Sequence, residues 1–225
     1  MWDPSQYLRY AGERARPFFD LLARVGADDP SYVADLGCGP GNLTAVLADR
    51  WPGAEVVGVD NSPEMIDAAG TEARNRSRDR LSFTLADIRD WRPDRKADVL
   101  VSNAVLQWVP GHLDLVRSAR WAPLLGGVAL NRQARGPAEY LDLLARACCS
   151  VDAWETTYLH VLPGQDPVVE WYRGTGLRPV LAALDHGQAE GFIAEYRERV
   201  AEAYPAAPYG TVLPFRRVFV VAQAA

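Results

Sequence analysis

Short apolar runs in the first half of this chain alternate with amphipathic stretches. The apolar runs, which suit strands buried on both faces of a sheet, lie at 32–36, 55–60, 81–85, 97–102 and 127–130. Helical patterns occupy 7–25 and 42–50, and a further helix begins after Ser62-Pro63, because serine caps helices well and proline fits the first turn. This alternation predicts βαβ units around a mostly parallel sheet.

The second half continues the pattern with longer elements. A helix is expected from Gly136-Pro137 to about 147, a strand at 150–159, a helical stretch at 167–184, a helix at 188–204 and a last strand at 214–222. A final strand after a long helix suits an antiparallel insertion at the sheet edge, although the pattern leaves its direction open. We therefore expect an α/β Rossmann-like fold with a mostly parallel seven-stranded sheet, helices on both faces and a small helical cap.

The length of 225 residues fits one domain. Within 1–225 we expect an N-terminal helical segment at 1–30, a ligand-binding half at 31–130, and a second half at 131–225 that carries cap elements. Apolar residues make up 48% and charged residues 24%, which excludes a disordered chain. The net charge of −5 argues against a nucleic-acid partner.

Cysteine content and hydropathy bear on location. The three cysteines, Cys38, Cys148 and Cys149, form neither a disulfide framework nor a metal-ligand pattern, so we expect a reducing compartment and no metal. No stretch approaches the ~18 apolar residues of a membrane span, and the first residues lack a signal-peptide pattern. The sequence predicts a cytoplasmic protein without a membrane partner, and it leaves the oligomeric state unknown.

A glycine-rich loop at 35–41 follows the first strand and precedes a helix. Glycines at 37, 39 and 41 permit a tight turn and a close ligand approach. The dinucleotide pattern G-x-G-x-x-G fails in both registers, because its third glycine position holds Asn42 or Thr44. A phosphate-free ligand such as S-adenosylmethionine fits better, with Asp35 holding its ammonium directly or through water, and with the backbone of Gly37, Cys38, Gly39 and Gly41 beside it.

Residues at three more strand ends complete this predicted pocket, because open α/β sheets bind ligands at the carboxyl ends of their strands. Asp60, about 20 positions past the loop, is placed to accept both ribose hydroxyls. After the third strand, Asp87 is placed to accept the adenine amino group while Ile88 flanks the ring; Asp87 alone equally suits a helix cap. After the fourth strand, Asn103 and Ala104 would face the methionine part.

The chain resembles the trans-aconitate 2-methyltransferases, which are class I S-adenosylmethionine-dependent enzymes. The motifs that carry the resemblance are MWDP at 1–4, the loop at 37–41, DNSPEM at 60–65, VSNAVLQWVP at 101–110, VDAWETTYLH at 151–160, GTGLRP at 174–179 and FRR at 215–217. The resemblance implies a class I methyltransferase fold and adds Asn61, Met65 and Trp108 to the cofactor site. It also implies that the N-terminal helix folds over the cofactor as a lid; an amphipathic helix packed on the sheet is the alternative.

The activity that the resemblance implies is methylation of one carboxylate of trans-aconitate to a monomethyl ester, with S-adenosylhomocysteine as the second product. A carboxylate is already ionised at neutral pH, so no general acid or base is expected. The predicted substrate-positioning residues are Arg14, Trp108, Tyr158, Arg178 and Arg217. Arg216 and Arg217 lie on opposite sides of a strand, so at most one faces inward; Trp108 and Tyr158 equally suit a core, and Arg14 a solvated helix surface.

One departure from the family pattern lies at 130–137, where the family carries a further few dozen residues that include part of the substrate cap. Either the protein has this segment and the sequence lacks it, or the chain has lost it, which would open the pocket and allow a different acceptor. Two alternatives of other classes remain: a non-catalytic protein that binds S-adenosylmethionine, and a nicotinamide oxidoreductase, against which the broken dinucleotide pattern argues.

Overall fold

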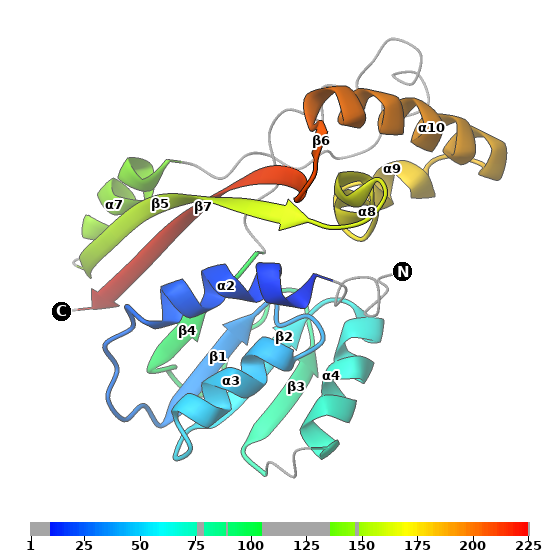
Figure 1. Cartoon of the computed structure of the whole chain (residues 1–225). Coiled ribbons are helices and arrows are strands. Elements are labelled where there is room, and N and C mark those ends of the chain that lie inside the picture. The colour runs from blue at the N-terminus through cyan, green and yellow to red at the C-terminus, as the bar shows by residue number, and fades with distance from the viewer. Residues whose placement is uncertain (1–9, 76–78, 89, 105–135, 147–148, 225) are drawn as a thin grey trace. The chain divides into compact units, whose positions relative to one another are not determined.

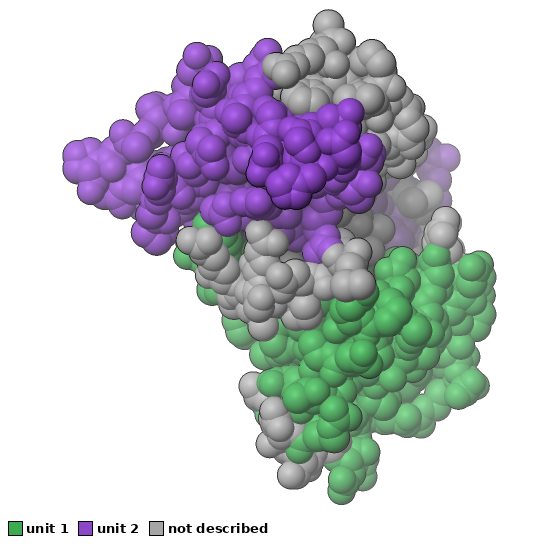
Figure 2. All heavy atoms as spheres, turned by 90° about the vertical axis from the view of Figure 1, so that its right-hand side faces the viewer, with its two compact units in different colours: residues 1–106 green, residues 107–225 purple. Residues whose placement is uncertain are grey.

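The computed structural model describes residues 10–75, 79–88, 90–104, 136–146 and 149–224 (Figure 1). The chain divides into two compact units, Met1–Leu106 and Gln107–Ala225, which Figure 2 colours separately. The predicted single domain, with its lid at 1–30 and its halves at 31–130 and 131–225, stays a prediction. Among the described residues, no helix combines the length and the apolar character needed to cross a membrane.

The first unit contains a parallel sheet and three described helices. Its elements are α2 (Ala11–Leu22), β1 (Tyr32–Leu36), α3 (Asn42–Arg50), β2 (Glu55–Asp60), α4 (Pro63–Asn75), β3 (Leu81–Leu85) and β4 (Val99–Val101). The strand order is β3-β2-β1-β4, with every neighbouring pair parallel. From β1 the chain first adds β2 and β3 on one side, and it then returns to add β4 on the other side of β1. The loop after β1 lies at this switch point, where open α/β sheets bind ligands.

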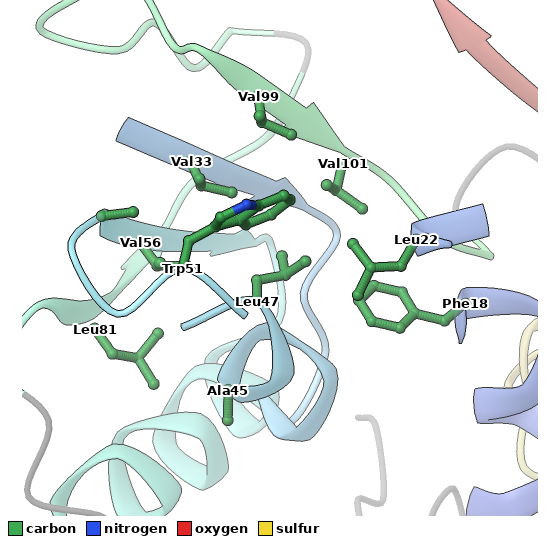
Figure 3. Packing of buried hydrophobic residues seen from close by; sticks show 11 residues of the cluster. Phe18, Leu22, Val33, Ala45, Leu47, Trp51, Val56, Leu81, Val99 and Val101 are labelled. Carbon is green, nitrogen blue, oxygen red and sulfur yellow. The ribbon is translucent and has the colours of Figure 1, made fainter. Parts of the chain in front are cut away.

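One face of this sheet is covered by α2 and α3. Phe18 and Leu22 of α2 and Leu47 of α3 belong to the same buried cluster as Val33 on β1 and Trp51 after α3 (Figure 3). The indole of Trp51 also donates a hydrogen bond to the carbonyl of residue 27, at 3.0 Å. Helix α2 is therefore packed on the sheet, as one of the two interpretations of the N-terminal helix predicted, while residues 1–9 lie outside the described ranges.

The second unit is built on two long strands. Its elements are α7 (Pro137–Ala145), β5 (Cys149–Leu162), α8 (Pro167–Arg173), α9 (Arg178–Ala182), α10 (His186–Ala203), β6 (Ala206–Ala207) and β7 (Gly210–Ala224). Strands β5 and β7 pair antiparallel over their whole length, from Cys149 opposite Ala224 to Leu162 opposite Thr211, and β6 pairs with the other edge of β7. The last strand, whose direction the sequence pattern left open, is therefore antiparallel to β5.

Six of the seven expected strands lie in the described part of the chain. Four of them form the parallel sheet, the seventh expected strand at 127–130 lies outside the described residues, and β5 and β7 pair with each other, with β6 on the other edge of β7. The two sets of strands differ in burial: β1 and β2 are buried nearly throughout, whereas β7 alternates buried and less buried positions. Alternation suits an antiparallel sheet with one covered face, and continuous burial suits a parallel sheet covered on both.

Several elements differ in their boundaries from the sequence pattern; β5 and β7, for example, are longer than the predicted strands at 150–159 and 214–222. Two of the differences have a local cause. Strand β4 is shorter than the predicted 97–102, because the carboxylate of Asp98 accepts hydrogen bonds from the backbone N–H and hydroxyl of Ser31, both at 2.8 Å, and from the N–H of Tyr32 at 3.0 Å. The predicted helical stretch at 167–184 is two helices, since a turn at 174–177 brings the N–H groups of Thr175 and Leu177 onto the carbonyl of Tyr172.

Candidate functional site

The loop after β1 has the backbone of a glycine turn. Gly37, Gly39 and Gly41 have φ values of 78°, 55° and 79°, a left-handed region that other residues adopt at a cost. A Cβ at Gly41 would lie 2.6 Å from the ring of Phe83, so this glycine is needed for close packing below the loop. A Cβ at Gly39 would meet nothing within 4 Å, so the space beside Gly39 is open to a ligand.

The N–H groups of this loop are already used inside the protein. Those of Gly37 and Cys38 donate to the carbonyl of Val59, at 2.7 and 3.0 Å, and that of Gly41 donates to the carbonyl of Cys38, at 3.2 Å. The N–H of Gly39 donates to Asp60, at 2.9 Å, and Pro40 has none. A pyrophosphate needs such N–H groups free to point at its oxygens. The geometry thus adds to the sequence argument against a dinucleotide.

Asp60 joins the glycine loop to the start of α4. One carboxylate oxygen accepts the N–H of Gly39 and the other accepts the N–H of Ser62, both at 2.9 Å. Each oxygen keeps a second lone pair, which leaves the half-buried carboxylate able to accept hydroxyl groups from a ligand. The predicted cap of α4 is confirmed, because the hydroxyl of Ser62 accepts the N–H of Met65, at 3.3 Å.

Asp35 ends β1 as a buried carboxylate, with 2% of its surface exposed. The hydroxyl of Thr44, in the first turn of α3, donates to it at 2.7 Å. Burial raises the pKa of Asp35 to about 6; the Thr44 hydrogen bond opposes this rise, and the negative charge of Asp60 adds to it. The sequence interpretation considered Thr44 only as a failed glycine position and missed this contact, because residues nine apart meet only once the strand and the helix have packed.

Cys38 is a free, buried cysteine of the loop. Burial raises the pKa of its thiol far above the usual range, and the charges of Asp35 and Asp60 raise it further. A thiol that stays protonated is a poor nucleophile. Cys38 therefore contributes backbone and packing to the loop rather than a reactive group.

The other strand-end residues predicted for the cofactor lie at the same edge of the sheet. The carbonyl of Asp87 accepts the N–H groups of Asp90 and Trp91, so Asp87 opens a turn. Ile88 packs against a second buried cluster, which consists of Tyr32, Ala34, Val57 and Val59. The hydroxyl of Ser102 donates to the carbonyl of Leu36, at 2.9 Å, and so holds the end of β4 against the end of β1.

Four further predicted positions differ in exposure. Asn103 is half-buried, while Ala104 is exposed with a φ of 63°, a left-handed conformation that is uncommon for alanine. Asn61 is exposed, and Met65 is buried with 3% exposure, so it would contact a ligand only as part of the pocket wall. Trp108 lies outside the described residues.

The predicted substrate residues fall in both units. Arg14 in α2 is buried, with 6% exposure, which excludes the solvated-helix interpretation. In the second unit, Arg178 begins α9 and is half-buried. Tyr158 and Arg217 are buried, and the β5–β7 register puts them on one face, with Tyr158 opposite Phe215 and Arg217 two residues further along.

The alternation expected for Arg216 and Arg217 is observed. The guanidinium of Arg217 lies over the ring of Phe215, 4.5 Å from its centre, on the buried face. Arg216 is on the opposite face, where its guanidinium binds the carboxylate of Glu155 and lowers the pKa of that carboxyl. Arg217 is therefore the one of the pair that faces inward.

Comparison with known proteins places this geometry in a family. The methyltransferase domain model matches residues 33–121. The trans-aconitate 2-methyltransferase of Streptomyces avermitilis is 49% identical over 259 aligned positions, which cover 99% of this chain and 96% of that protein. The enzyme of the same name from Mycobacterium sp. (strain KMS) is 46% identical, with 99% of both chains covered. This chain belongs to the trans-aconitate 2-methyltransferase family.

Solved structures share the fold with this family member. A methyltransferase from Geobacter sulfurreducens, in complex with S-adenosylhomocysteine, is 18% identical with a TM-score of 0.51, covering 95% of this chain and 91% of that one. The YcgJ protein of Bacillus subtilis is 10% identical with a TM-score of 0.53, covering 93% of this chain and 99% of that one. The fold is therefore the Rossmann-like class I methyltransferase fold, as predicted.

Membership of this family makes the chain an S-adenosylmethionine-dependent methyltransferase, and the site fits that cofactor. A pair of carboxylates, Asp35 and Asp60, stands beside a loop with open space at Gly39 and with its own N–H groups already bonded. Such a site favours a ligand that carries positive charge and hydroxyl groups over one that carries phosphates. When bound, S-adenosylmethionine supplies a sulfonium-activated methyl group.

The family alignment also bears on the departure at 130–137. The alignment with the Streptomyces avermitilis enzyme spans 259 positions, whereas this chain has 225 residues, so at least 34 positions of that relative have no counterpart here. The sequence is continuous from 1 to 225. The sequence is thus shorter than that relative within the aligned range, and the predicted place of the missing segment lies almost wholly outside the described residues.

Proposed function

We propose that this enzyme transfers the methyl group of S-adenosylmethionine to one carboxylate of trans-aconitate and forms a monomethyl ester and S-adenosylhomocysteine. The observation that carries the proposal is the 49% identity with a trans-aconitate 2-methyltransferase over 99% of the chain. The chemistry needs no general base, because the acceptor oxygen is ionised at neutral pH. The protein has to orient the acceptor in line with the methyl group and to exclude water.

The cofactor half of the proposal rests on the residues around the glycine loop. Asp35 holds the ammonium, Asp60 accepts the ribose hydroxyls, and Gly37, Cys38, Gly39 and Gly41 line the ligand with backbone. Asp87 and Ile88 receive the adenine, Asn103 and Ala104 receive the methionine part, and Asn61 and Met65 complete the wall. The support is the clustering of these residues at the carboxyl ends of β1, β2, β3 and β4, together with the hydrogen bond that the N–H of Gly39 in the loop donates to Asp60.

The acceptor half of the proposal rests on buried cations. A polycarboxylate needs guanidinium and hydroxyl partners in a site that excludes water, and a guanidinium can bind a carboxylate through two parallel hydrogen bonds. Arg217 is 5% exposed on a face that also carries Tyr158, at 3% exposure. We assign acceptor binding to these two residues first, with Arg14 and Arg178 as further candidates.

The neighbouring arginines allow a matched test of the acceptor site. Arg217→Gln should raise the KM for trans-aconitate by about tenfold or more, because it removes a charge-assisted hydrogen bond to the substrate. Arg216→Gln should leave that KM within about twofold, because Arg216 lies on the opposite face, where it pairs with Glu155. An exposed ion pair of this kind contributes little to stability, so the variant should also stay folded. Equal KM values for the two variants, both with wild-type thermal stability, would exclude Arg217 from acceptor binding.

The reaction itself is tested with the wild-type protein, S-adenosylmethionine and a panel of tri-, di- and monocarboxylic acids. Mass spectrometry should find a monomethyl ester of trans-aconitate as the most rapidly formed product, and a failure to methylate any carboxylic acid would sink the proposal. Because at least 34 positions of the relatives are absent, some dicarboxylates should also be accepted.

A net charge of −5 supports a small-molecule rather than a nucleic-acid partner. The cytoplasmic location stays a prediction from cysteine use and hydropathy.

A further inference from the structure

Thr44 is in contact with the acidic residue that ends β1. Its side chain is fully buried, and its hydroxyl donates to the carboxylate of Asp35 at 2.7 Å. Within the described part of the chain, this is the one hydrogen bond that the Asp35 carboxylate receives. A carboxylate that is removed from water depends strongly on such a donor, because an unpaired buried charge is far less stable than a hydrogen-bonded one.

We propose that Thr44 is a positioning residue for cofactor binding: its hydroxyl keeps the buried Asp35 carboxylate ionised and oriented toward the ammonium group of S-adenosylmethionine. The inference rests on the proposed role of Asp35 and names a residue that the proposed site does not contain. Thr44 itself touches no cofactor atom in this assignment. It acts through Asp35, from the first turn of α3, whose N-terminal end also favours negative charge.

The surroundings of Asp35 show why the hydroxyl matters. Asp60 from β2 adds a negative charge, the thiol of Cys38 from the loop stays neutral, and the facing segment of β4, Val99–Val101, brings no ionisable group. Burial and Asp60 both favour the protonated form of Asp35, and Thr44 is the group that opposes them. Loss of the hydroxyl would therefore leave more Asp35 neutral, and a neutral carboxyl attracts an ammonium weakly.

The experiment measures binding of S-adenosylmethionine and S-adenosylhomocysteine to the whole protein by calorimetry between pH 6 and pH 8.5. The variants are Thr44→Val, which keeps the shape and removes the hydroxyl, Thr44→Ser, which restores it, and Asp35→Asn. Thr44→Val should weaken both ligands about tenfold, by the value of one hydrogen bond to a charged group. The loss should be larger at pH 6 than at pH 8.5, because more of the variant's Asp35 is protonated there, and Thr44→Ser should recover most of it. The kcat at saturating cofactor should change little.

The double variant separates positioning from mere packing. If Thr44 acts through Asp35, then adding Thr44→Val to Asp35→Asn should cost no further affinity. Wild-type affinity in Thr44→Val, or the same loss with and without the Asp35 carboxylate, would overturn the inference. Wild-type affinity in Asp35→Asn alone would instead remove Asp35 from the cofactor site, and with it the basis of the inference, while methylation of trans-aconitate by the wild-type enzyme would stand. Thermal denaturation of each variant shows whether it is folded.

Discussion

The buried carboxylate of Asp35 should reduce the stability of the ligand-free enzyme at neutral pH. A carboxyl group whose pKa is higher in the folded than in the unfolded protein binds its proton more tightly when folded, so it destabilises the fold as the pH rises and it ionises. The pKa rises from the model-compound value of 3.8 to about 6. Replacing Asp35 with asparagine keeps the size of the side chain and removes the ionisation.

The magnitude follows from that rise. A difference of about two pH units corresponds to about 3 kcal/mol, since each unit is worth about 1.4 kcal/mol. The sign is fixed by the order of the two values: the cost is absent below the unfolded pKa, grows between the two values and is complete above the folded one. About half of it should develop between pH 5 and pH 8.

The assay compares urea unfolding of the wild type and Asp35→Asn, both free of ligand, at several pH values from 5 to 8. The asparagine amide brings its own costs in a buried site, but these do not change with pH, so the informative quantity is the slope of the difference in unfolding free energy. The unfolding free energy of Asp35→Asn should rise relative to that of the wild type as the pH rises. In saturating S-adenosylmethionine the variant should show no such rise, because the ligand stabilises only the protein that binds it.

A constant difference between the two proteins from pH 5 to pH 8 would refute the reasoning. It would mean that Asp35 is solvated or better hydrogen-bonded than its 2% exposure and its Thr44 contact imply. A difference that changes with pH in the opposite direction would mean that a positive group stabilises the ionised form. Either result would also remove the electrostatic reason for Thr44 to matter.

Three glycines lead to further predictions. A Cβ at Gly58 would lie 2.6 Å from the ring of Phe83, so Gly58→Ala should lower the unfolding free energy by about 1–3 kcal/mol through overpacking, as measured by urea unfolding. Gly12→Ala in α2, where a Cβ meets nothing within 4 Å, is the matched control and should raise stability by up to about 1 kcal/mol; equal effects of the two changes would contradict the packing argument. Gly39→Ala should lower the unfolding free energy by about 1–2 kcal/mol because Gly39 has a positive φ. It should also weaken the binding of S-adenosylmethionine in a calorimetric titration, since the added methyl enters the open space beside the loop. Unchanged affinity would place the ligand elsewhere.

Elements of the first unit could be predicted from the sequence almost residue by residue. The strands at 32–36, 55–60 and 81–85 and the helix at 42–50 have the predicted bounds, because each is a short apolar run or a helix with clear start signals. Strand β4 was predicted too long, since Asp98 reads as a strand residue in the pattern but bonds to backbone with its side chain. Such a contact depends on a partner 66 residues away, which no local pattern reveals.

The second unit shows a different limit. The last strand was predicted, but its pairing with β5 was not, because periodicity reports which face is buried and not which strand lies beside it. The two-residue strand β6 is too short to leave a pattern. For the site, the acidic and glycine positions could be predicted from motif spacing, whereas the contact of Thr44 with Asp35 required the helix to be docked.

The arrangement of charge around the glycine loop explains how one fold can select a cationic cofactor. In dinucleotide-binding relatives of this fold class, free N–H groups at a helix N-terminus attract phosphate. In this chain the N–H groups of the loop are bonded to Val59, Cys38 and Asp60, and two carboxylates stand beside them. The resulting negative potential favours a ligand that bears positive charge and hydroxyl groups over one that bears phosphates.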